Sequence, residues 1–187
     1  MIHRKYFFDS VRSDLFHGSL TQAQVDGLNM FLDWHDDSNP ELPAHYHLDD
    51  RSFAYVLATT YHETGATMQP IREYGSTSYL KSKPYYPYYG RGYVQLTWEA
   101  NYQTQDAKLD LGGTLVKDPD LALDPRIALQ VILGGMVDGD FTGKKLADYF
   151  NDQLTDWVDA RRIVNGTDRA TDIAGYAISF SDAITYV

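Results

Sequence analysis

Residues 127–137 read Ile-Ala-Leu-Gln-Val-Ile-Leu-Gly-Gly-Met-Val, which is the longest apolar run in the chain. Asp124-Pro125 stands just before it, and a capping residue followed by proline is typical of the start of a helix. A helix that is apolar on almost every side is expected to be buried, and Gly134 and Gly135 leave room for a close neighbour. We therefore expect a central buried helix that the rest of the protein surrounds.

Helical periodicity in other segments predicts a mainly α protein. Thr21 and Gln24 have the spacing of a capping box, and apolar residues follow them at helical intervals. A second helix is expected from Asp50 to Gly65, because glycine tolerates the left-handed conformation that ends many helices. Later helices are expected after Thr97, from Thr155 to Asn165-Gly166, and after a cap at Asp168.

Residues 66–96 have a different pattern, because prolines and glycines repeatedly interrupt any helix there. The same segment is rich in tyrosine between Tyr74 and Tyr93. We expect it to form a small irregular or β lobe that makes one wall of a cleft. We find no internal repeat or linker, so residues 1–187 are interpreted as a single domain without a separate cell-wall-binding domain.

The composition excludes several classes of function. The chain has 187 residues and a formal net charge of −10, with no cluster of basic residues, so a nucleic-acid partner is not expected. It contains no cysteine, which excludes disulfides and thiol nucleophiles. No apolar run reaches the length of a membrane span, and the first residues lack a signal-peptide pattern. We expect a monomer that is not a membrane protein and that accumulates in the cytoplasm.

Glu63 is expected at the end of the second helix, on the same side as the core residues Val56 and Thr60. Burial and the negative end of the helix dipole both disfavour an ionised carboxylate. Such a group could hold a proton near neutral pH and donate it to a glycosidic oxygen. The alternative is an ordinary solvent-facing residue at a helix end, and position alone leaves both interpretations open.

Glu73 lies at the start of the irregular lobe. Hydrolysis of a glycosidic bond requires a second carboxylate across the sugar, which activates water or attacks carbon. A chain reversal between the two glutamates would bring them to opposing walls of a cleft. The alternative is a surface salt bridge from Glu73 to Arg72 or Arg91. The tyrosines and Trp98 would suit the flat faces of sugars, or would simply pack the lobe.

The sequence lacks a complete metal motif. His62-Glu63 begins like the helix of a zinc protease, but Ala66 occupies the position of the second histidine. His45 and His47 have no further ligand in view, so a role at the surface or in the core is favoured for them. We therefore expect neither a metal nor a cofactor.

Several ordered motifs resemble the signature of family 19 chitinases, and most of all the compact endolysins of that family encoded by bacteriophages and prophages. The resemblance runs from about Thr21 to the C-terminus, and its motifs are too long for chance agreement. The matching segments are His62-Glu63-Thr64-Gly65, Glu73, residues 89–98 (Tyr-Gly-Arg-Gly-Tyr-Val-Gln-Leu-Thr-Trp), Asn101-Tyr102 and residues 160–166 (Ala-Arg-Arg-Ile-Val-Asn-Gly).

This resemblance implies a lysozyme-like α+β fold and a metal-free mechanism that inverts the anomeric centre. It assigns Glu63 as general acid, Glu73 as general base and Thr97 as the residue that helps to hold the attacking water. Tyr93 replaces a proline of the plant members, and the chain has no room for the loops that extend their chitin groove. The expected substrate contacts lie in or next to the matching motifs: His62, Tyr74, Tyr89, Arg91, Gln95, Asn101 and Asn165.

The predicted function is that of a peptidoglycan-degrading endolysin, an N-acetylmuramidase. It would hydrolyse the β-1,4 bond between N-acetylmuramic acid and N-acetylglucosamine. Action on the cell wall or in the periplasm would require release from the host cytoplasm through a membrane lesion made by a holin, a partner that only the resemblance implies. The alternatives are a chitinase acting on N-acetylglucosamine oligomers, a non-catalytic saccharide-binding protein, a zinc amidase and a lytic transglycosylase.

Overall fold

The computed structural model describes residues 1–37 and 46–187, so the interpretation of His45 lies outside the described residues. This part of the chain is mainly helical, as predicted. Its α-helices are α1 (Arg4–Asp14), α2 (Gln22–His35), α3 (Asp50–Glu63), α4 (Thr77–Lys81), α5 (Glu99–Lys108), α6 (Thr114–Lys117), α7 (Pro125–Asp138) and α8 (Ala170–Ala183). Short 3-10 helices lie at η1 (Pro119–Leu123), η2 (Leu146–Asp148) and η3 (Asp159–Ile163).

A two-stranded antiparallel sheet lies in the Tyr-rich lobe. Strands β1 (Ile71–Arg72) and β2 (Arg91–Gly92) pair so that Ile71 faces Gly92 and Arg72 faces Arg91. The lobe also contains α4, so it is irregular with a small β element, as the prolines and glycines of residues 66–96 predict.

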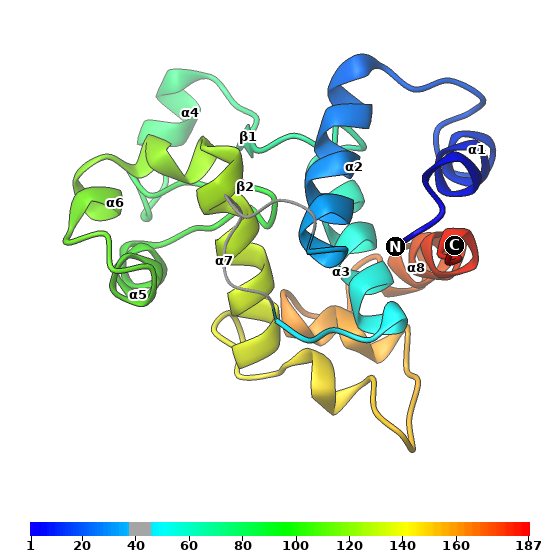
Figure 1. Ribbon diagram of the computed structural model, residues 1–187. Helices are drawn as coiled ribbons and strands as arrows, with labels where there is room; N and C mark the ends of the chain where they lie inside the picture. Colours follow the sequence, from blue (N-terminus) through cyan, green and yellow to red (C-terminus); the bar gives the residue numbers. More distant parts are fainter. Residues whose placement is uncertain (38–45) are drawn as a thin grey trace.

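Helix α7 passes through the middle of the molecule (Figure 1). The lobe that carries α4, α5, α6 and the small sheet lies on one side of it, and α2 and α3 lie on the other. Helices α1 and α8 pack together at the far side, where the two ends of the chain meet. There the N–H of His3 donates to the carbonyl of Thr185 over 2.7 Å.

Two helices form the centre of the core. Asp124 caps α7 by accepting from the N–H groups of Arg126 and Ile127, and most of the following residues are buried. The predicted central helix is therefore confirmed. Helix α3 is just as deeply buried, since every residue from 52 to 60 is enclosed. It ends at Glu63 and is followed by Gly65 with a φ of +58°, as the sequence predicted.

The expected close neighbour of α7 is the ring of Phe141. A Cβ atom on Gly135 would come within 2.1 Å of that ring, so only glycine allows the contact. The helix prediction for α2 is also confirmed, because Thr21 and Gln24 form both hydrogen bonds of a capping box.

Two helix predictions near the C-terminus are wrong. Residues 155–158 are not helical, because Thr155 pairs with Phe150 in an isolated β-bridge, and only the short η3 follows. Asp168 does not cap α8. The residue before that helix is Arg169, which has a φ of +58° and makes no side-chain cap hydrogen bond. Helix α1 was not predicted. Among the described residues, no helix has both the length and the apolar character needed to cross a bilayer.

Gly27 provides a test of how α2 packs on the loop after α3. A Cβ atom at Gly27 would lie 1.9 Å from the carbonyl oxygen of Met68, which is backbone and cannot move aside cheaply. Gly27→Ala should therefore lower the free energy of unfolding by about 1–3 kcal/mol in urea titrations, despite the better helix propensity of alanine.

Gly175 in α8 is the matched control, because no atom lies within 4 Å of the position that a methyl group would take there. Gly175→Ala should raise the free energy of unfolding by up to about 1 kcal/mol. Equal effects of the two substitutions would contradict this packing of α2.

Candidate active site

Glu63 and Glu73 line the same cleft, which has a volume of about 490 Å³. Glu63 comes from the end of α3 and Glu73 follows β1, so the helical body and the Tyr-rich lobe each contribute one carboxylate. The remaining lining residues are Tyr85, Gly90, Val94, Gln95, Leu96, Thr97, Trp98, Asn101, Phe141, Val164 and Asn165. The cleft thus gathers the predicted Thr97, Gln95, Asn101 and Asn165 around the two glutamates.

Glu63 is held by an arginine that the sequence reasoning did not include. The Nη1 group of Arg161, on η3, donates to Oε1 of Glu63 over 2.6 Å. The side chain of Glu63 is 17% exposed and that of Arg161 is 4% exposed, so this ion pair is mostly removed from water. Glu63 therefore does not lie on an open surface. The expectation for its charge considered burial and the helix dipole, whereas the guanidinium acts in the opposite direction.

His62 is half-buried next to this ion pair. Burial lowers the pKa of His62 below its usual value of 6.5. The negative charge of Glu63 opposes this shift, and the positive charge of Arg161 adds to it. His62 is therefore a neutral imidazole at neutral pH. It is not among the residues that line the cleft.

Both oxygens of the Glu73 carboxylate accept hydrogen bonds from the lobe. The hydroxyl of Tyr85 donates to Oε1 over 2.8 Å, and the N–H of Gly90 donates to Oε2 over 3.0 Å. The N–H of Glu73 in turn donates to the carbonyl of Gly90 over 2.7 Å. The alternative salt bridges are not formed, since Arg72 and Arg91 both pair with Asp120.

Tyr85 is a protonated donor at every pH of interest. Burial, followed by the hydrogen bond to Glu73 and the charge of Glu73, raises the pKa of Tyr85 to about 12. Its hydroxyl therefore keeps its proton and its contact with the carboxylate well into the alkaline range.

The segment from Gly90 to Trp98 forms the floor of the cleft under backbone strain. Gln95 has a φ of +56° and Trp98 a φ of +76°, which are unfavourable for residues with a Cβ atom and which occur most often at functional sites. The amide of Gln95 secures this conformation by donating to the carbonyl of Ile71 over 3.0 Å. The hydroxyl of Thr97 donates to the carbonyl of Gln95 over 2.8 Å, so its oxygen lone pairs can accept from another group.

Four predicted substrate contacts lie outside the lining of this cleft: His62, Tyr74, Tyr89 and Arg91. Arg91 is only 4% exposed and donates to Asp120, to the hydroxyl of Tyr102 and to the carbonyls of Pro87 and Tyr89. Its donors are thus used within the lobe. Tyr74 is 76% exposed, and together with Tyr89 it lines a neighbouring hollow on the other side of Glu73.

The structure adds site residues that the sequence reasoning missed, namely Arg161, Tyr85 and Phe141. A signal existed for two of them. Arg161 stands within the matching segment 160–166, and Gly135 indicated a close neighbour without saying which one. In the described ranges, no group of three or more acidic, histidine or cysteine side chains is arranged to hold a metal ion.

Comparisons with known proteins identify the fold. No family model matches the chain. Two endochitinases of Arabidopsis thaliana are 38% and 37% identical to it over 87 residues, which cover 43% of this chain and 30% of each relative. The chain therefore spans less than a third of the length of these curated relatives.

Two solved structures match almost the whole chain. Chitinase C from Streptomyces griseus HUT6037 has a TM-score of 0.59 and 20% identity, covering 96% of this chain and 74% of that one. A variant of chitinase C has a TM-score of 0.55 and 20% identity, covering 97% and 91%. The protein thus has a chitinase-like fold, and the predicted lysozyme-like α+β architecture is confirmed. Identity at this level establishes the fold alone.

The hydrogen bond between Tyr85 and Glu73 predicts a pH-dependent contribution to stability. Tyr85→Phe should lower the free energy of unfolding by about 1 kcal/mol near pH 8, because the carboxylate loses a donor. The pKa of Tyr85 is higher in the folded protein than the usual value of 10, so this contribution is complete below pH 10. The difference between the two proteins should then shrink as the pH rises from 10 towards 12.

Urea titrations at several pH values measure this difference. Tyr79→Phe is the matched control in the same lobe, at a ring that is 45% exposed, and it should change stability by less than about 0.5 kcal/mol. A Tyr85→Phe effect that stays constant up to pH 12 would show that the hydroxyl does not donate to Glu73.

Proposed function

We propose that this protein is a glycoside hydrolase that cuts β-1,4 bonds in a polymer of N-acetylated amino sugars. The observation that carries the proposal is the presence of Glu63 and Glu73 in one cleft, each from a different part of the fold. Hydrolysis of an acetal with two carboxylates requires one to protonate the leaving oxygen and the other to act on the opposite face of the sugar.

Glu63 acts as the general acid in this proposal. Its Oε1 is occupied by Arg161, so Oε2 is the atom that carries the proton to the glycosidic oxygen. Negative charge develops on Glu63 as the proton leaves. The guanidinium of Arg161 is already in place to stabilise that charge, without any rearrangement during the reaction.

Glu73 acts as the general base. A carboxylate offers about four lone-pair sites, and Tyr85 and Gly90 occupy two of them, so sites remain for a water molecule. Thr97 lines the same cleft and its oxygen can accept the second proton of that water. The water then attacks the anomeric carbon from the face opposite the leaving group. This order of events inverts the anomeric configuration.

The lining of the cleft suits an amino-sugar chain. Trp98 is 50% exposed and presents an aromatic surface that can cover the apolar C–H face of a sugar ring. Asn101 and Asn165 supply amide groups for hydroxyls and N-acetyl groups. The chitinase-like fold and the matched endochitinases support the same class of substrate.

For the particular substrate we propose peptidoglycan, cut between N-acetylmuramic acid and N-acetylglucosamine by a phage-type endolysin. The resemblance of the motifs to compact endolysins and the short chain support this choice. The protein would act as a monomer on the cell wall after leaving the cytoplasm through a holin-type lesion. Chitin oligomers are the second candidate substrate, favoured by the endochitinases that match. A pure saccharide-binding protein would not need both carboxylates with their fixed partners.

Mass spectrometry of a peptidoglycan digest tests the proposal. The unaltered protein should release fragments that end in a reducing N-acetylmuramic acid. Glu63→Gln should keep the fold and lose at least about a hundredfold in rate, because an amide cannot donate an acidic proton. The rate is measured by the release of new reducing ends.

Asp152→Asn is the control, since it removes one carboxylate charge from an exposed loop position away from the cleft. It should retain the parental rate. A parental rate in Glu63→Gln would contradict the acid role. Release of oligomers from chitin with none from peptidoglycan would replace the substrate, and fragments with anhydro ends would indicate a lytic transglycosylase.

A further inference from the structure

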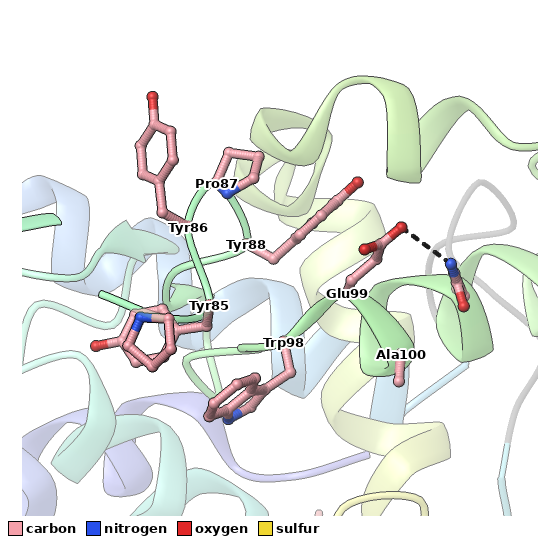
Figure 2. A pocket seen from close by; sticks show the side chains of 9 residues that line it. Tyr85, Tyr86, Pro87, Tyr88, Trp98, Glu99 and Ala100 are labelled. Atoms are coloured by element: carbon pink, nitrogen blue, oxygen red, sulfur yellow. Dashed lines mark hydrogen bonds between the residues drawn. The ribbon is translucent and has the colours of Figure 1, made fainter. Parts of the chain in front are cut away.

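A second hollow of about 480 Å³ lies directly beside the cleft and is nearly as large. It is formed by the turn from Pro84 to Tyr88 and by the start of α5, with Trp98, Glu99, Ala100 and Gln103. In Figure 2, Tyr85 and Trp98 lie next to each other on one side of it, and Tyr88 and Glu99 lie on the other. No residue of this hollow other than Trp98 was predicted to contact substrate, and none is needed for the chemistry proposed above.

Tyr85 and Trp98 form a ridge that the two hollows share, because both residues line both of them. Their rings meet edge to face, with 5.3 Å between centroids and an angle of 74°. The hydroxyl of Tyr85 holds Glu73, while the indole of Trp98 is half exposed. A chain that leaves the cleft over this ridge therefore enters the second hollow without a break.

The strained backbone of Trp98 is what turns its side chain onto this ridge. Its φ of +76° and ψ of 136° are unusual for a residue with a Cβ atom, and it stands immediately before α5. Such strain persists only where neighbouring contacts enforce it, and here the N–H of Trp98 donates to the carbonyl of Tyr88 across the hollow over 2.9 Å.

The opposite wall is polar. Glu99 and Gln103 lie one turn apart on α5, and the amide of Gln103 donates to Oε1 of Glu99 over 3.1 Å (Figure 2). Oxygen atoms of both groups can accept hydrogen bonds from hydroxyl or amide donors. Aromatic rings facing a paired carboxylate and amide are the combination that a neutral sugar with an N-acetyl group requires, whereas the charge of Glu99 disfavours an anionic ligand.

We propose that this hollow is an additional sugar-binding subsite, which holds one or more N-acetylated sugar units of the same glycan chain beyond those in the catalytic cleft. The assignment rests on the proposed function and names how the enzyme would select longer chains. Its occupant stacks on Trp98 and bonds to Glu99 and Gln103, with Ala100 leaving the space open.

Binding of N-acetylglucosamine oligomers to the Glu63→Gln protein tests the subsite separately from hydrolysis. By calorimetry, the hexamer should bind roughly three- to tenfold more tightly than the trimer, because only the longer chain reaches over the ridge. Ala100→Trp, added to the same protein, should fill the hollow and abolish this preference while leaving the affinity for the trimer unchanged. Gln103→Ala should reduce the preference without the bulk of the new side chain.

Thr104→Trp is the matched control, since it introduces the same side chain at an exposed position of α5 that lines neither hollow. It should keep the preference for the hexamer. Equal affinities for trimer and hexamer, or a preference that survives both Ala100→Trp and Gln103→Ala, would overturn the subsite. If the unaltered protein bound the hexamer preferentially but cut neither glycan, the proposed hydrolysis would fail while the subsite would stand.

Discussion

The cleft depends on the hydrogen bonds between Glu73 and Gly90. The backbone of Glu73 donates to the carbonyl of Gly90, and its carboxylate accepts from the N–H of the same residue. Glycine is required there, because a Cβ atom at Gly90 would come within 2.8 Å of the side-chain oxygen of Gln95. These contacts join the two halves of the Tyr-rich lobe and fix one carboxylate in the wall of the cleft. Arg161 fixes the other from the helical body.

The lobe is small, and buried polar contacts stabilise it where an extended apolar core would do so in a larger one. Arg91 lies at its centre, with its guanidinium over the ring of Tyr89 at 3.7 Å and its Nε donating to Asp120 over 2.7 Å. Removing one partner would leave a charge buried without compensation, which costs far more than the pair contributes. This explains why a motif residue that resembles a ligand-binding group serves the architecture that presents Glu73.

Local patterns predicted those parts of the fold that local interactions determine. Thr21 and Asp124 cap their helices through residues two or three positions away, so the sequence reveals both. The failed helix at Thr155 has a suitable apolar spacing, but the bridge to Phe150 satisfies its backbone instead. The partner of Glu63 is 98 residues away in the chain, and no spacing rule connects them. The two glutamates were found through a resemblance of motifs, whereas their hydrogen-bond partners required the fold.

The central claim is that Glu63 and Glu73 act on opposite faces of one sugar, with a water molecule between Glu73 and the anomeric carbon. Proton NMR of soluble glycan strands during cleavage tests it most directly, because it detects the configuration of each new reducing end before mutarotation. The arrangement predicts that the β-linked substrate first yields the α anomer. An initial β anomer would show direct attack by a carboxylate or another nucleophile and would contradict the account.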